Sequence, residues 1–205
     1  MSLCGDNPRF LYCLTIQNYG EYTSNGEEYD IVHLNDTNKL TNELNEFLSC
    51  IYLSDKDLPN LLNYFETCDR DVIVAMCGDH APAIDFDKTI NEYDLKIRTV
   101  PFIIWSNKKK LINKNIDGKK MSMIYFLPSI LETANMPMSK YYNFLIKLRN
   151  NIPIITKYGK NYDNEYNAFD YEDKQEYKKL LDMYFNLEYS NVLEKEVSGF
   201  FVNNE

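Results

Sequence analysis

Asp79 and His80 are adjacent side chains whose types and spacing could do chemistry together. A carboxylate oxygen beside an imidazole nitrogen is a ligand set suited to Mn, Zn or Fe, and is less typical of Ca. Two ligands do not hold a metal tightly, so a complete site needs at least one or two more from elsewhere. The structural alternative is that Asp79 caps the following turn while His80 bonds a backbone carbonyl. His33, the only other histidine, lies in a polar stretch and is expected on the surface.

The segment that carries this pair begins with a continuous apolar run at 71–77 and continues through Gly78. Such a run predicts a strand covered on both faces, as in a parallel sheet. Ligands of open α/β sheets bind just outside the carboxyl ends of the strands, which is where the pair falls. Gly78 lets the backbone turn sharply, so that both side chains can aim at one point.

The elements expected around this strand alternate between extended and helical patterns. Apolar spacing and capping residues predict strands at 10–16, 71–77 and 100–105, and helices at 38–52, 57–65, 122–134, 141–148 and 173–189. The order predicts an α/β fold, a layered and mostly parallel sheet flanked by helices. Pro128 is expected either to kink its helix or to start the ordered part.

Composition limits the class of protein further. The chain has 205 residues, 44% of them hydrophobic, which fits one domain or one large piece of a bigger domain. The formal net charge of −9 argues against nucleic acid as a partner. Five scattered cysteines leave the compartment undecided, and no run of apolar residues is long enough to cross a membrane. No signal peptide begins the chain, and Met1-Ser2-Leu3 followed by polar residues suggests that the natural polypeptide extends upstream.

Several motifs occur in the order found in one known superfamily. VAMCGDHAP resembles the GDH element of sulfatases and alkaline-phosphatase-like enzymes, and FLYCLTIQNYGEY resembles a stretch that there usually reads T-x-Q-N-H-G-P-Y. LSCIYLSDKDLPNLLNYFE, VPFIIWSN, MSMIYFLPSILETANMPMSKYYNFL and KLLDMYFNLEYSNVL resemble later or intervening pieces. The resemblance is greatest to the lipoteichoic acid synthase, or phosphoglycerol transferase, branch. It covers 9–155 as a sulfatase-like core portion and 156–205 weakly, as a helical C-terminal tail.

The resemblance implies the C-terminal portion of an alkaline-phosphatase-like domain in a metal-dependent transferase. Such an enzyme acts on phosphate esters, free or lipid-linked, at the extracellular face of the membrane or as a secreted protein. In the family a threonine nucleophile and a glutamate join the Asp-His pair around one divalent ion, commonly Mn, with Mg, Zn and Ca as alternatives. Asp79 and His80 carry over as metal ligands. The threonine and glutamate belong to the N-terminal half of the family domain, which is then the required partner, and this chain alone should show little or no turnover.

Tyr19 departs from the family pattern, because it stands where the family usually has a histidine that contacts phosphate. A phenol can donate a hydrogen bond but carries no positive charge. Asn18 and Tyr19 are therefore candidate substrate-binding residues, with a plain loop role as the alternative. Two other functions stay open: a true sulfatase or phosphodiesterase acting on sulfate or phosphate esters, and a non-catalytic cell-surface binding domain, which Tyr19 favours. A sheet that lacks its N-terminal strands would expose an edge and allow homo-oligomers.

Overall fold

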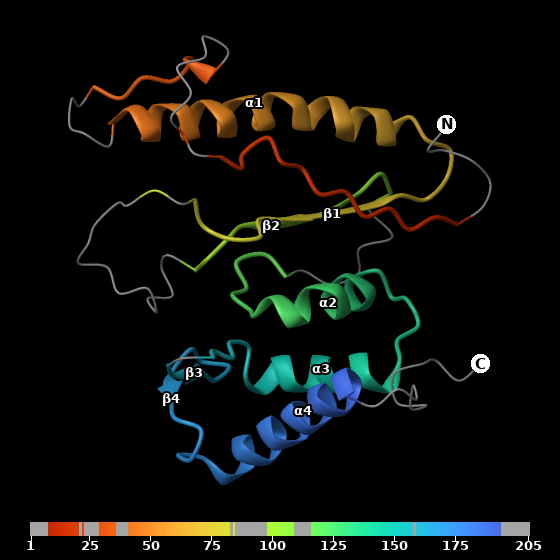
Figure 1. The fold of residues 1–205 in the computed structure, drawn as a ribbon. Helices are drawn as coiled ribbons and strands as arrows, with labels where there is room; N and C mark the ends of the chain where they lie inside the picture. The colour runs from red at the N-terminus through yellow and green to blue at the C-terminus, as the bar shows by residue number, and fades with distance from the viewer. Residues whose placement is uncertain are drawn as a thin grey trace. The chain divides into compact units, whose positions relative to one another are not determined.

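The computed structural model describes residues 8–20, 22, 29–35, 41–82, 84, 98–108, 116–157 and 159–193. The chain forms two compact units, Met1–Lys108 and Lys109–Glu205. Helices and short sheets occur in both, so the predicted α/β class is confirmed (Figure 1). No helix of the described ranges has the length and apolar character needed to cross a membrane.

The first unit contains one long helix and one pair of strands. Helix α1 spans Thr41–Glu66, strand β1 spans Ile73–Cys77 and strand β2 spans Phe102–Ser106. The two predicted helices are therefore one helix, because the chain continues through Pro59 and gives up only the hydrogen bond that the proline cannot donate. The capping residue Asp57 and the following Pro59 predicted the start of a second helix, but the first helix continues through both residues.

Strands β1 and β2 pair antiparallel, with Ala75 opposite Ile104 and Cys77 opposite Phe102. The prediction of a mostly parallel sheet is wrong for the strands that the structure describes. An apolar run reports burial and not direction, so it fits either kind of ladder. β1 is also only partly covered, since Met76 is 38% exposed.

The segment at 10–16 is not a strand, and this prediction is also wrong. A strand needs a hydrogen-bonded neighbour, and β1 and β2 pair with each other instead. The large side chains of the segment face solvent, with Phe10 83%, Tyr12 81% and Ile16 74% exposed. The segment therefore has the composition of a buried strand, but its large side chains are exposed.

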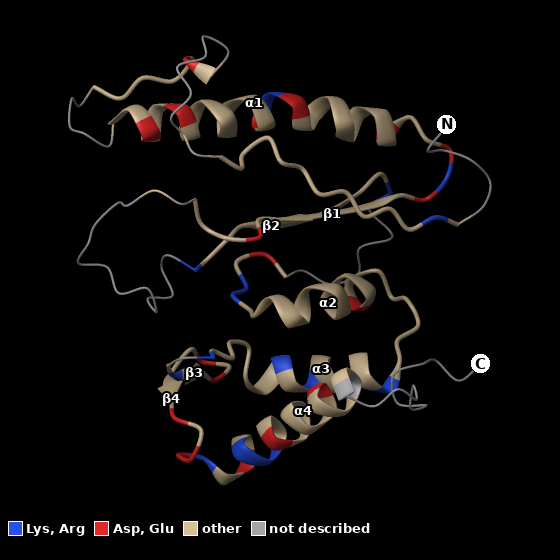
Figure 2. Cartoon of the chain, viewed as in Figure 1, with Lys and Arg blue, Asp and Glu red and all other residues tan. Residues whose placement is uncertain are grey.

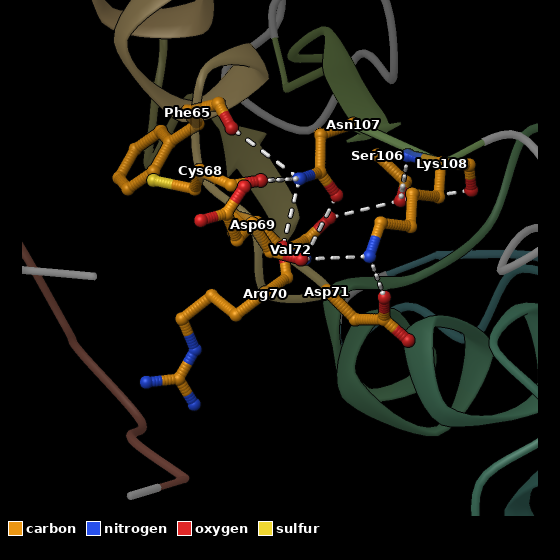
Figure 3. A network of polar contacts seen from close by, with 9 residues as sticks. All are labelled: Phe65, Cys68, Asp69, Arg70, Asp71, Val72, Ser106, Asn107 and Lys108. Atoms are coloured by element: carbon orange, nitrogen blue, oxygen red, sulfur yellow. Dashed lines mark hydrogen bonds and ion pairs between the residues drawn. The ribbon is translucent and has the colours of Figure 1, made fainter. Parts of the chain in front are cut away.

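Asn107, directly after β2, ties the end of α1 to the start of β1 (Figure 3). Its side-chain nitrogen donates to the backbone carbonyls of Phe65, Cys68 and Arg70 at 3.3, 3.2 and 2.9 Å. Its side-chain oxygen accepts from the backbone nitrogen of Val72 at 2.9 Å. One side chain thus satisfies carbonyls at the C-terminal end of the helix and in the connection that follows it.

The residues on either side of Asn107 strengthen the same connection. The Ser106 hydroxyl donates to the carbonyl of Val72 at 2.8 Å, and Lys108 Nζ donates to the carbonyl of Asp69 and to a carboxylate oxygen of Asp71 at 3.0 and 2.6 Å. Acidic and basic side chains both lie where the chain passes from α1 into β1 (Figure 2). The end of β2 therefore fixes the path by which the chain enters β1.

The second unit is built on helices. A short 3-10 helix η3 (Met123–Tyr125) leads into α2 (Phe126–Thr133), and α3 (Lys140–Asn151) and α4 (Gln175–Leu193) follow. Pro128 lies in the first turn of α2, where a backbone N–H has no partner within the helix, so the missing N–H costs nothing. Of the two predicted alternatives, the structure shows that Pro128 marks the ordered start of the helix and does not kink it. Strands β3 (Asn161–Tyr162) and β4 (Ala168–Phe169) form a small antiparallel pair.

The core of the second unit joins these helices through apolar and aromatic side chains. Its buried members are Tyr125, Phe144, Leu145, Leu148, Ile152, Phe169, Leu181 and Tyr184. Arg149 is only 14% exposed and donates to the Ser129 hydroxyl at 2.6 Å and to the Glu132 carboxylate at 2.7 Å, so this charge is paired where it is covered. The helices predicted for this half are confirmed, with boundaries shifted by a few residues.

We expect Asn107→Ala to lower the free energy of unfolding of the first unit by about 2 kcal/mol, because several partly covered backbone groups lose their partner. The measurement is urea unfolding followed by the fluorescence of Trp105, the only tryptophan. Asn60→Ala, on an exposed face of α1, is the matched control and should change stability by no more than about 0.5 kcal/mol. Equal stability of the two variants would contradict the role of Asn107.

Candidate metal centre

Gly78 begins the turn that follows β1 and brings the two candidate ligands to the end of the strand. Its backbone nitrogen donates to the carbonyl of Pro101 at 3.1 Å. A Cβ built on Gly78 would lie 3.0 Å from Cβ of Val100, tighter than nine in ten real Cβ contacts. The glycine therefore eases the close approach of the chain that leads into β2, and the chain bends at the next two residues, Asp79 and His80.

Asp79 and His80 lie at the carboxyl end of β1 with their side chains 68% and 58% exposed. Asp79 Oδ2 lies 3.4 Å from His80 Nε2. The other carboxylate oxygen, Oδ1, accepts the backbone N–H of His80 at 2.9 Å. His80 Nδ1 lies 2.8 Å from the carbonyl oxygen of Ala81.

On each side chain these backbone contacts leave one atom, Nε2 of His80 and Oδ2 of Asp79, that could bind a metal. A carbonyl oxygen only accepts, so Nδ1 of His80 is the donor in this contact, and Nε2 has its lone pair whenever the ring is neutral. Oδ2 of Asp79 is likewise the oxygen not used by the backbone. A metal about 2.1 Å from both atoms would hold them between about 3.0 Å apart at a right angle and about 3.4 Å at a tetrahedral angle. The observed separation fits a shared divalent ion.

The structural alternative stated from the sequence is also present in these contacts. Asp79 does cap the next backbone nitrogen and His80 does bond a backbone carbonyl. The two interpretations are compatible, since a metal-bound histidine usually donates its other ring N–H to a carbonyl or carboxylate. Metal-ligand status itself therefore stays a prediction.

The pair is at most part of a metal site. Among the residues that the structure describes, no group of three or more His, Cys, Asp and Glu side chains could hold a metal. Cys77 precedes the pair, but partial desolvation, and then the negative charge of Asp79, raise the pKa of its thiol. The thiolate is the form that binds a metal, so the raised pKa makes Cys77 a weaker candidate ligand than Asp79 and His80.

The structure brings the second predicted group, Asn18 and Tyr19, next to the first. The ring centroids of Tyr19 and His80 lie 6.1 Å apart in an edge-to-face arrangement at 75°. Asn18 points instead toward α1, where its side-chain oxygen accepts from the Ser54 hydroxyl at 3.0 Å. The substrate-binding roles of both residues stay predictions. His33 is exposed, as predicted, and its Nδ1 lies 3.5 Å from a carboxylate oxygen of Asp30.

Two residues near the pair were not singled out from the sequence as part of the site. Ser54 anchors Asn18, and the hydroxyl of the buried Tyr22 donates to the Asn18 carbonyl at 2.7 Å. Burial, followed by the nearby Cys50, Asp79 and Glu46, raises the pKa of Tyr22, so the phenol stays a donor. A serine in a helix and a tyrosine in a loop are common, so only their contacts with Asn18 in the folded structure reveal their position.

The sulfatase family model matches residues 4–136, more than half of the chain, and the chain therefore belongs to the sulfatase family. A solved structure with a similar fold is the Streptococcus pyogenes phosphoglycerol transferase GacH in complex with sn-glycerol-1-phosphate. The likeness has a TM-score of 0.58 at 19% identity and covers 77% of this chain and 37% of that chain. This chain thus spans little more than a third of that protein. No curated protein matches the sequence.

The His80 ring should be protonated on Nδ1 when it is neutral, because its partner is the Ala81 carbonyl. The measurement is the pair of nitrogen chemical shifts of each imidazole in a ¹⁵N-labelled chain at mildly alkaline pH. His33 is the internal comparison, since it is the only other histidine and faces a carboxylate instead. A His80 ring with its proton on Nε2 would contradict the proposed availability of that nitrogen.

Proposed function

We propose that this chain supplies the Asp79–His80 ligand pair of a metal-dependent phosphoglycerol transferase of the sulfatase family. The observation that carries the proposal is the 3.4 Å separation of two exposed donor atoms, Asp79 Oδ2 and His80 Nε2, in a chain of this family. The similar fold of a phosphoglycerol transferase bound to sn-glycerol-1-phosphate supports phosphoglycerol as the transferred group. Manganese is the expected ion, with Mg, Zn and Ca as alternatives.

The residues of this chain prepare the two donor atoms before any ion arrives. The Ala81 carbonyl holds the His80 proton on Nδ1, and the His80 backbone N–H occupies one oxygen of Asp79. Nε2 and Oδ2 are left 3.4 Å apart at the exposed end of β1. A divalent metal held by such a pair, once its other ligands are present, lowers the pKa of a nucleophile and offsets negative charge on the phosphoryl group.

The nucleophile and the remaining ligands are proposed to come from polypeptide outside these 205 residues. The partial coverage of the phosphoglycerol transferase supports this arrangement, as does the limit of two donors in the described residues. We also propose that the site works on the extracellular side of the membrane or in a secreted protein. Cys68 is disulfide-bonded, and such bonds persist in oxidising compartments.

Asp79→Ala in the complete polypeptide should remove the bound metal. We expect about one equivalent of Mn²⁺ per chain in the unaltered protein, because the family site holds a single ion, and a large loss when one anionic ligand is deleted. Elemental analysis after gel filtration measures the metal content. Asp57→Ala, an exposed carboxylate on α1, is the control and should keep the ion. Unchanged metal in Asp79→Ala would exclude Asp79 as a ligand.

The complete polypeptide should release diacylglycerol from vesicles that contain phosphatidylglycerol, and His80→Ala should reduce the release to background. The 205-residue chain alone should release none, since the nucleophile is proposed to lie outside it. Mass spectrometry of the lipid fraction measures the product. Cleavage of an aryl sulfate without diacylglycerol release would instead support a true sulfatase, and robust activity of the isolated chain would contradict the division of the site.

A further inference from the structure

Asn18 is the anchor of an otherwise exposed stretch of chain. Among residues 8–20 it alone is half-buried, while its neighbours face solvent. Its side-chain oxygen accepts from the Ser54 hydroxyl at 3.0 Å and its carbonyl accepts from the Tyr22 hydroxyl at 2.7 Å. The backbone nitrogen of Tyr19 closes a turn onto the carbonyl of Ile16 at 3.0 Å. The turn at 16–19 is therefore held from two sides at one residue.

The turn presents Tyr19 to His80. The edge-to-face geometry, at 6.1 Å between ring centroids and 75° between planes, lies in the range that aromatic pairs prefer. His80 is otherwise fixed by its Nδ1 contact with Ala81, which leaves the imidazole on a single hydrogen bond. A second contact on the ring limits its rotation and keeps Nε2 toward Asp79.

We propose that Ser54 is a positioning residue for His80, acting through Asn18 and the ring of Tyr19. The hydroxyl of Ser54 holds Asn18 against α1, the turn places Tyr19 beside the imidazole, and the phenol ring keeps Nε2 directed at Asp79 Oδ2. In this arrangement Tyr19 supports the metal ligand, in addition to any contact with substrate. The positioning role serves the proposed function only if His80 is a metal ligand. The contacts that make up this role can be tested without metal.

The two histidines of the chain make the test selective. The carbon-bound ring protons of both are recorded by NMR in the 205-residue chain without metal. Tyr19→Leu should displace the His80 signals, because the neighbouring ring current is lost, and leave His33 unchanged. Ser54→Ala should displace the His80 signals in the same direction, and Ser54→Thr, which keeps the hydroxyl, should restore them.

Ser49→Ala is the matched control on the same helix. The Ser49 hydroxyl accepts from the backbone nitrogens of Ile31 and Val32 at 3.1 and 2.9 Å, next to His33 and away from Asn18. This variant should displace the His33 signals and leave His80 in place. Displacement of His80 by both serine variants would show a general loosening of α1 and overturn the proposal.

Two further results would overturn the positioning role. One is a folded Ser54→Ala variant with unchanged His80 signals. The other is an Asn18→Ala variant with unchanged His80 signals. This variant decides the case if α1 does not tolerate the loss of Ser54, because it removes the same hydrogen bond by changing Asn18 instead. Displacement in Asn18→Ala, with His33 unchanged, supports the role.

Addition of Mn²⁺ separates this inference from the proposed function. Substoichiometric Mn²⁺ should broaden the His80 signals selectively, and Ser54→Ala should weaken that binding by about tenfold, as the loss of an outer partner of a metal ligand does. This titration uses the complete polypeptide, which supplies the remaining ligands. No broadening there would contradict the ligand role of His80, whereas the metal-free displacements would still decide the positioning role. Equal Mn²⁺ affinity of the unaltered protein and of Ser54→Ala would overturn the link between the positioning role of Ser54 and metal binding at His80.

Discussion

The first unit depends on the way Asn107 closes the connection between α1 and β1. That connection leaves the C-terminal end of a 26-residue helix and must enter a strand in a single register, and its carbonyls cannot all find partners along the chain. Asn107 satisfies three of them and the nitrogen of Val72 at once. Because Asn107 directly follows β2, the same residue sets where β1 starts relative to β2 (Figure 3).

The position of the candidate ligands follows from this register. With Cys77 opposite Phe102, the next residue on each side is Gly78 and Pro101, and a backbone hydrogen bond joins them. The strand then ends, and Asp79 and His80 follow Gly78, where a side chain would press against Val100. A shift of one residue would turn the whole strand over and send the pair to the opposite side. The chemistry of the site is local, but its place is set by contacts about thirty residues away.

The sequence predicted well those features that depend on local pattern. The apolar run before Gly78 forms a strand, the candidate ligand pair falls at its end, and the helices of the second unit lie where their spacing indicated. Features that depend on partners were not predictable in the same way. The direction of β2, the lack of a strand at 10–16 and the continuity of α1 through Pro59 all depend on which backbone groups meet, and residue type does not record that. The contact of Ser54 with Asn18 is of the same kind, since 36 residues separate them.

The exposed apolar segment at 10–16 also has a consequence for how the chain is made. Ribosomes add roughly 5 to 20 residues each second, and β2 ends about 90 residues after this segment. The segment therefore spends roughly 5 to 20 s outside the ribosome before the sheet beside it can be complete. Phe10, Tyr12 and Ile16 remain open to solvent even in the folded unit. Extended, apolar and free of charge after Arg9, this stretch is a surface on which a holding chaperone can act during synthesis and on which aggregation can begin when none is present.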